Sequence, residues 1–224
     1  MVIGKKLTGK STLVKDLLYH HRDLPIGTVI SPTESCKKFY SEIMPSQFIQ
    51  DEYTPDVIEN FVKRQVVLLR SVNHNPNLNT DPRAFFVLDN CMFDYIWTEV
   101  NCFMMNARSY KVMFIITMEC AVDVPPCIRS FIDHVFIFCE NRESYRKRIY
   151  DLYAGYFSTF DKFCEVMDQC TDNVCLVIDF TAKSDNIVDQ VFWYKAEQHD
   201  EFQIGAHEFW TESKECTEDD LLLL

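Results

Sequence analysis

Four residues near the amino terminus constrain the fold of this chain more than any other feature. They follow the pattern G-x-x-x-x-G-K-S and are Gly4, Gly9, Lys10 and Ser11. The segment 12–18 that comes next has the apolar spacing of a helix. Glycine permits the backbone angles that turn N–H groups inward around an anion, and the start of a helix adds a partial positive charge. The pattern therefore predicts a loop that binds the phosphates of a nucleoside triphosphate.

Each part of this loop has an expected role. Lys10 would place its ammonium group on the β- and γ-phosphates, and Ser11 would offer its hydroxyl to Mg²⁺, so the expected cofactors are ATP and Mg²⁺. The alternative is a lysine-rich surface turn, but two of only five glycines in the chain fall at the required spacing. The predicted nucleotide-binding residues are Gly4, Lys5, Lys6, Leu7, Thr8, Gly9, Lys10, Ser11 and Thr12.

The remainder of the chain reads as one α/β domain. A length of 224 residues, 47% of them hydrophobic, is enough to bury a substantial core. We expect a single domain over 1–210 and an acidic tail over 211–224. Short apolar runs alternate with helical patterns, which predicts a mainly parallel central sheet flanked by helices. Three residues precede the loop, so the first strand is expected to be short or truncated.

Individual elements follow from the same patterns. Strands are expected at 26–32, 84–88, 112–117, 134–139 and 174–180. Helices are expected at 34–44, at 55–69 with Thr54 as N-cap, and around the amphipathic run 145–153. The aromatic residues Phe192, Trp193 and Tyr194 could stack on bases, but their strand-like setting favours packing in the core.

Charge and cysteine content limit the class of protein. A net charge of −12 argues against a surface that coats nucleic acid generally. Basic residues do gather on the segment 142–148, where they form either a solvated face or a local contact with DNA or another subunit. Ten cysteines without C-x-x-C spacing favour free thiols in a reducing compartment, and six histidines show no metal-ligand spacing. The apolar stretches are too short to span a bilayer, so we expect a soluble, intracellular protein that is not secreted.

A second candidate residue follows the strand expected at 84–88. Asp89 ends that apolar run, and nucleoside triphosphatases hold Mg²⁺ with an acid in such a position. An aspartate after a strand can also be a simple turn residue. Downstream of a complete phosphate loop, Ser11 and Asp89 together are the predicted metal ligands.

Several segments together resemble one known family. That family is the genome-packaging ATPases of large nucleocytoplasmic DNA viruses, the poxvirus-type relatives of the FtsK/HerA translocases. The resemblance covers nearly the entire chain. It implies a homo-oligomeric ring that hydrolyses ATP to drive double-stranded DNA into a preformed capsid, in the cytoplasm of the host cell or in the virion. The matching segments are 4–15, 20–23, 28–34, 88–92, 114–118, 125–129, 133–136, 146–150 and 191–196.

The resemblance also implies roles for single residues. Lys10 would be catalytic, Asp89 would complete the metal site, and Arg129 would be an arginine finger that acts on a neighbouring subunit, although Arg129 could instead cap the end of its own helix. Family members usually carry a second acid after the metal-binding aspartate and a glutamine at the end of the strand expected at 112–117. This chain has Asn90 and Glu119 at these places.

These departures leave three functions open. Glu119 could act as the general base that Asn90 cannot be, which gives an active motor. The same changes, with the short first strand, could instead mark a nucleotide-binding subunit with little or no turnover. A small-molecule kinase would use the same loop, but it would need an arginine-rich lid that the sequence does not show.

Overall fold

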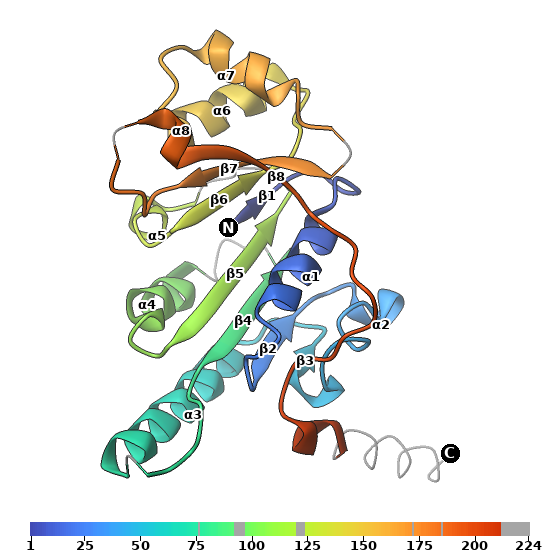
Figure 1. Ribbon diagram of the computed structural model, residues 1–224, viewed down its shortest axis with the longest axis vertical. Coiled ribbons are helices and arrows are strands. Elements are labelled where there is room, and N and C mark those ends of the chain that lie inside the picture. Colours follow the sequence, from blue (N-terminus) through green and yellow to red (C-terminus); the bar gives the residue numbers. More distant parts are fainter. Residues whose placement is uncertain (76, 92–96, 120–123, 172, 185, 212–224) are drawn as a thin grey trace. The chain divides into compact units, whose positions relative to one another are not determined.

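The structure is a computed structural model that describes residues 1–224 except 76, 92–96, 120–123, 172, 185 and 212–224 (Figure 1). Its strands are β1 (Val2–Ile3), β2 (Gly27–Ile30), β3 (Ile49–Gln50), β4 (Ala84–Asp89), β5 (Val112–Met118), β6 (His134–Ile137), β7 (Val174–Asp179) and β8 (Val191–Lys195). Its helices are α1 (Lys10–His20), α2 (Glu34–Lys37), the 3-10 turn η1 (Ser46–Phe48), α3 (Pro55–His74), α4 (Trp97–Ala107), α5 (Pro126–Arg129), α6 (Glu143–Tyr153), α7 (Phe160–Met167) and α8 (Ile187–Gln190).

The strands form one eight-stranded sheet in the order β3-β2-β4-β5-β1-β6-β7-β8. Strand β2 pairs in parallel with β3 and β4, and β1 pairs in parallel with β5 and β6. Strand β7 runs in the opposite direction to its two neighbours, because it is antiparallel to both β6 and β8. The predicted α/β fold with a mainly parallel sheet is confirmed, and so is the short first strand.

The chain divides into two compact units. The first, which we name the loop unit, comprises Met1–Asp16 and Ile116–Gln198 and contains the predicted phosphate loop. The second, which we name the β4 unit, comprises Leu17–Ile115 and His199–Leu224 and contains Asp89. Most of the acidic tail expected over 211–224 lies outside the described residues.

The core of the β4 unit is a run of phenyl rings between helices and strands. Phe61 of α3 lies 4.8 Å from Phe86 of β4, measured between ring centroids, and Phe86 lies 5.3 Å from Phe103 of α4. Every residue of β4 is buried. Burial of rings this large supplies most of the stabilising hydrophobic free energy of such a core. Helices α3 and α4 therefore pack on one face of β4 (Figure 1).

The core of the loop unit has the same character. Alternate residues of β6 and the four central residues of β7 are buried, and the rings of Tyr150 on α6 and Phe163 on α7 lie 5.8 Å apart. The amphipathic helix expected around 145–153 is confirmed as α6, which buries Ile149 and Tyr153. β8 is an edge strand, and Phe192 and Trp193 are each 41% exposed. The expectation that these two residues pack in the core is wrong, because β8 stands at the end of the sheet and, in the described part of the chain, pairs with β7 alone.

Two predicted helices have different lengths in the structure. The helix expected at 34–44 ends at Lys37, since Lys38 adopts a left-handed backbone conformation with φ of +50°. The helix expected at 55–69 continues to His74, and Thr54 stands at its N-cap position without a capping hydrogen bond from its side chain.

Two expectations concern the chemistry of the whole chain. The eight cysteines that the structure describes are all free thiols, as the spacing predicts. Within the described ranges, no helix combines the length and the apolar character needed to cross a bilayer.

Candidate nucleotide-binding site

The phosphate loop begins where β1 ends, in the middle of the loop unit. The Gly4 amide donates to the carbonyl of Met118 at 3.0 Å, and the Phe138 amide donates to the carbonyl of Ile3 at 2.8 Å. These bonds extend the pairing of β1 with β5 on one side and with β6 on the other. Because parallel strands end at the same edge of a sheet, the residues that follow β5 and β6 also come to this edge, where ligands of α/β proteins bind.

The two loop glycines are required for different physical reasons. Gly9 has a φ of +103°, a backbone angle that residues with a side chain rarely adopt. A Cβ atom at this position would also collide with the side chain of Asn173. Gly4 is not among the described residues with positive φ; a Cβ at this position would lie 2.6 Å from Oγ1 of Thr8 and 2.7 Å from Cβ of Phe138. The expectation of a turned backbone is therefore confirmed for Gly9, whereas Gly4 is needed for close packing.

Lys10 is the first residue of α1 and is buried, with 9% of its surface exposed. Its ammonium group donates to the carbonyls of Gly4 at 2.6 Å and Lys5 at 2.8 Å. The hydroxyl of Thr8 donates to the same Lys5 carbonyl at 2.9 Å. These bonds fold the loop around the ammonium group of Lys10. Ser11 and Thr12 follow in the first turn of α1 and are half-buried.

Two acidic side chains lie against the loop, and sequence reasoning found only one of them. Glu119 follows β5, and its carboxylate lies 3.6 Å from the ammonium of Lys6 in an exposed ion pair. Glu140 follows β6, is only 6% exposed, and pairs with Lys5 at 2.7 Å. The missed signal is the position of Glu140 shortly after a strand that runs parallel to β1.

The contacts of Glu140 explain its ionisation. Burial disfavours the charged carboxylate, but the bonds from Lys5 and from the Arg142 amide, at 2.8 Å, outweigh this effect and lower the pKa of Glu140. The Glu140 carbonyl also accepts a hydrogen bond from Nε of Arg146. Glu140 therefore ties the loop to the start of α6 as a carboxylate.

Asp89 is the last residue of β4 and is buried, with 8% exposed. Its Oδ2 atom accepts a hydrogen bond of 3.0 Å from the phenol of Tyr40, which is fully buried. Burial, followed by the nearby charge of Asp89, raises the pKa of Tyr40 well above its usual value. Tyr40 therefore remains a neutral donor to this carboxylate.

The position of Tyr40 is set by another buried acid. The carboxylate of Glu34 accepts bonds from the backbone amides of Phe39 at 3.1 Å, Tyr40 at 2.8 Å and Ser41 at 2.7 Å. A carboxylate that accepts from three successive backbone amides in this way is a strong local constraint. Sequence reasoning assigned no role to Glu34 or Tyr40, which are separated from Asp89 by about fifty residues.

Asn90 adopts a left-handed conformation with a φ of +59°. Asparagine and aspartate tolerate this region better than other residues with side chains. The left-handed backbone at position 90 therefore favours asparagine or aspartate for a structural reason, independent of any role in proton transfer.

Arg129 ends the four-residue helix α5 and is half-buried. Its charge lies near the buried phenol of Tyr153; burial raises the pKa of Tyr153 to about 12, and Arg129 opposes this rise. The position at a helix end fits the capping alternative as well as that of an arginine finger.

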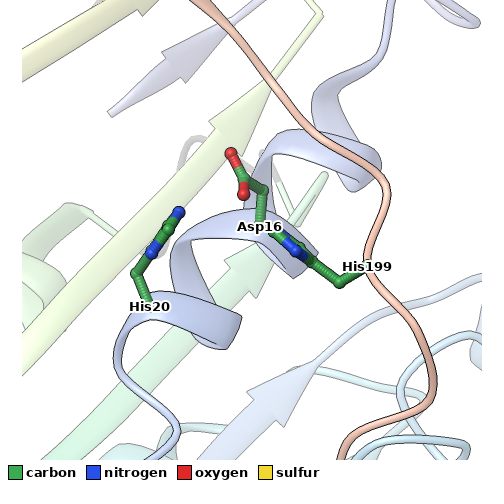
Figure 2. Close-up of side chains that lie close together, drawn as sticks. All are labelled: Asp16, His20 and His199. Atoms are coloured by element: carbon green, nitrogen blue, oxygen red, sulfur yellow. The ribbon is translucent and has the colours of Figure 1, made fainter.

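One histidine, His20, ends α1, and another, His199, stacks on a residue of that helix. Figure 2 shows Asp16 and His20 on successive turns of this helix and His199 on the segment after β8. The ring of His199 stacks on that of Tyr19 with centroids 3.6 Å apart, and Asp16 accepts a bond of 2.6 Å from the Tyr194 phenol. These contacts give the side chains roles in packing.

The chain is similar to several viral proteins along nearly its whole length. It is 33% identical to the uncharacterized protein L437 of Acanthamoeba polyphaga mimivirus over 216 residues, which cover 93% of this chain and 76% of L437. It is 37% identical to the uncharacterized protein 075L of Invertebrate iridescent virus 6, covering 93% of this chain and 82% of 075L. No protein-family model matches the sequence.

Solved structures share the fold at low sequence identity. The genome packaging NTPase B204 of Sulfolobus turreted icosahedral virus 2, in complex with ATP-gammaS, superposes with a TM-score of 0.54 at 14% identity, covering 87% of this chain and 94% of B204. The cytoplasmic domain of the type VII secretion ATPase EccC of Thermomonospora curvata gives 0.57 at 13% identity, covering 89% of this chain and 26% of EccC. These likenesses establish the P-loop ATPase fold, and the sequence relationship shows that the chain belongs to the family of viral proteins that includes L437 and 075L.

Proposed function

We propose that this protein is an ATP-hydrolysing motor that moves double-stranded viral DNA into a capsid during virion assembly. The observation that carries the proposal is the complete phosphate loop, folded around Lys10 at the end of β1 in a P-loop ATPase fold. The genome-packaging role of the NTPase B204 and the viral source of the relatives support the packaging role. We propose that the protein acts in the cytoplasm of the infected cell or in the virion.

The donor types fit the proposed cofactors. Lys10 would bind the β- and γ-phosphates, and the N–H groups at the start of α1 would bind phosphate oxygens. The hydroxyl of Ser11 and the carboxylate of Asp89 are the hard oxygen donors that Mg²⁺ prefers. When bound, the metal would neutralise charge on the phosphates. Arg129 is proposed as the finger that acts on a neighbouring subunit.

Glu119 is the proposed general base. Its ion pair with Lys6 holds its carboxylate beside the loop, and an exposed pair at 3.6 Å can exchange partners at little cost in free energy. A carboxylate within hydrogen-bond reach of a water molecule can take the proton that Asn90 cannot.

Assembly into a ring would use apolar surface. Several large hydrophobic side chains around α8 and β8 are exposed in the loop unit, where a monomer would leave them in water. They are Phe180, Ile187, Val188, Phe192 and Trp193. We propose that this face contributes to contacts between subunits or with capsid proteins.

The test is ATP turnover by the purified protein, with and without double-stranded DNA. We expect DNA to stimulate hydrolysis and Lys10→Ala to abolish it, with the exposed Lys162→Ala as a matched control that keeps it. Turnover that does not respond to DNA would contradict the motor. Binding of ATP without release of phosphate would instead support a second candidate, a nucleotide-binding subunit without turnover, which the presence of Asn90 favours.

A further inference from the structure

A cavity lies in the β4 unit, between the amino-terminal half of α3 and the strands β2 and β3. Its volume is about 390 Å³, within the range of small-molecule sites. Buried Thr28 and Phe61 line it together with exposed polar side chains. The residues that carry the argument are Gln47, Phe48, Gln50, Asn60, Phe61 and Arg64.

Arg64 is the unusual member of this lining. Its Nε and Nη2 atoms are buried and have no hydrogen-bond partner among the residues that the structure describes. The guanidinium carbon lies 4.6 Å from the ring centroid of Phe61 and 5.9 Å from that of Phe48. Aromatic faces attract a cation but do not accept its in-plane N–H bonds.

The burial of these two nitrogens is energetically costly, since it removes water from them and no hydrogen-bond acceptor among the described residues replaces it. The pKa of Arg64 reflects this, because burial alone lowers it to about 10. Arg64 still carries its charge at neutral pH. An anion that entered the cavity beside Arg64 would gain the attraction of this charge.

The shape of the vacant donor set indicates the kind of anion. The Nε and Nη2 hydrogens point from one edge of the guanidinium plane, and such a pair matches the two oxygens of a carboxylate. The rings of Phe48 and Phe61 offer flat apolar contact beside it, and the amides of Gln47, Gln50 and Asn60 can bond further polar groups. Asp56 also lines the cavity, and its negative charge repels a doubly charged phosphate more strongly than a singly charged carboxylate.

We propose that this cavity binds a small, flat carboxylate-bearing molecule, with Arg64 as the residue that pairs with its carboxylate. The site is distinct from the phosphate loop, since none of its lining residues belongs to that loop. It gives the β4 unit a ligand of its own, independent of ATP.

Benzoate is a suitable probe because it joins one carboxylate to one flat ring. Titration into the full chain, followed by protein NMR shifts, is expected to perturb resonances of residues that line the cavity and to saturate at one site. Arg64→Met keeps much of the side-chain length without the charge and is expected to weaken benzoate binding at least tenfold. Arg70→Met, a change at an exposed arginine of the same helix, is expected to leave binding unchanged.

Further probes separate the chemistry of the ligand. Benzamide has the same shape without the charge and is expected not to bind, and phenyl phosphate is expected to bind more weakly than benzoate. If Arg64→Met fails to fold, Arg64→Lys takes its place, because it keeps the charge and loses the paired donors. The proposal is overturned if benzoate does not bind, if it binds the Arg64 variants as well as the parent, or if phenyl phosphate or benzamide binds more tightly.

Discussion

The phenol of Tyr40 donates a 3.0 Å hydrogen bond to Oδ2 of Asp89, and both groups are buried. Tyr40 is itself held by the carboxylate of Glu34, so the acid that ends β4 depends on a segment near the start of the chain. This relationship gives Asp89 a fixed orientation before any ligand binds.

Tyr40→Phe removes this donor and leaves an oxygen of a buried carboxylate without its bond. We expect a loss of about 1–3 kcal/mol in the free energy of unfolding at pH 7, because a buried polar group loses its partner. Denaturation by urea measures this loss. Tyr156→Phe, at a partly exposed tyrosine, is the control and should change little. An equal effect of both changes would contradict the role of the bond.

The stability of the same variant should also depend differently on pH under alkaline conditions. The pKa of Tyr40 is raised well above 10.0 in the folded protein, so its contribution to stability is complete below pH 10 and declines as the pH rises toward the folded pKa. Unfolding measured between pH 9 and 11, roughly the range in which an unfolded tyrosine ionises, should therefore show a shallower decline for Tyr40→Phe than for the parent chain. Equal slopes would mean that Tyr40 ionises normally.

Glu140→Gln breaks the ion pair that ties Lys5 to α6. We expect the loop to loosen, with a loss of about 1–3 kcal/mol in stability, since a hydrogen bond to a charged group is removed. The folded pKa of Glu140 lies below 4.5, so this contribution is present above pH 4.5 and is lost as the pH falls through the folded value. The difference from the parent should shrink in acid. Glu143→Gln, at an exposed position, should show no such difference.

Gly9→Ala tests the turned backbone of the phosphate loop. Alanine at a φ of +103° is strained and would collide with Asn173, so we expect a destabilisation of about 1–3 kcal/mol and weaker binding of an ATP analogue. Gly155→Ala is the matched control, since no atom lies within 4 Å of the added Cβ. Thermal melting and calorimetric titration report the two effects. Undiminished nucleotide binding by Gly9→Ala would contradict the assigned loop.

Glu119→Gln tests the proposed general base. We expect turnover to fall by about 10²–10⁴ while nucleotide affinity is kept, because only proton transfer is removed. Asn90→Asp should retain activity, since aspartate also tolerates the left-handed backbone at this position. Single-turnover measurements separate the chemical step from binding. If Glu119→Gln hydrolyses ATP normally, another group takes the proton.

Local patterns determined much of this protein from the sequence alone. The phosphate loop, the strands near 84–88 and 112–117 and the amphipathic helix near 145–153 depend on neighbouring residues, and each was predicted. The helix expected at 34–44 ends early because the side chain of Glu34 accepts hydrogen bonds from backbone amides beyond Lys38. These bonds compete with the hydrogen bonds of a longer helix, and the apolar spacing does not reveal them. Phe192 and Trp193 were misassigned because burial on an edge strand depends on what covers it.

Tertiary structure alone decided which distant side chains meet. Glu140 reaches Lys5 because β6 runs parallel to β1 and ends at the same edge of the sheet, and Tyr40 reaches Asp89 across 49 positions of sequence. The guanidinium of Arg64 on α3 likewise lies 5.9 Å from the ring centroid of Phe48 on η1, a contact between separate elements. Sequence patterns record the spacing of residues along one element, whereas these contacts are set by sheet order and packing, which join elements that no local pattern connects.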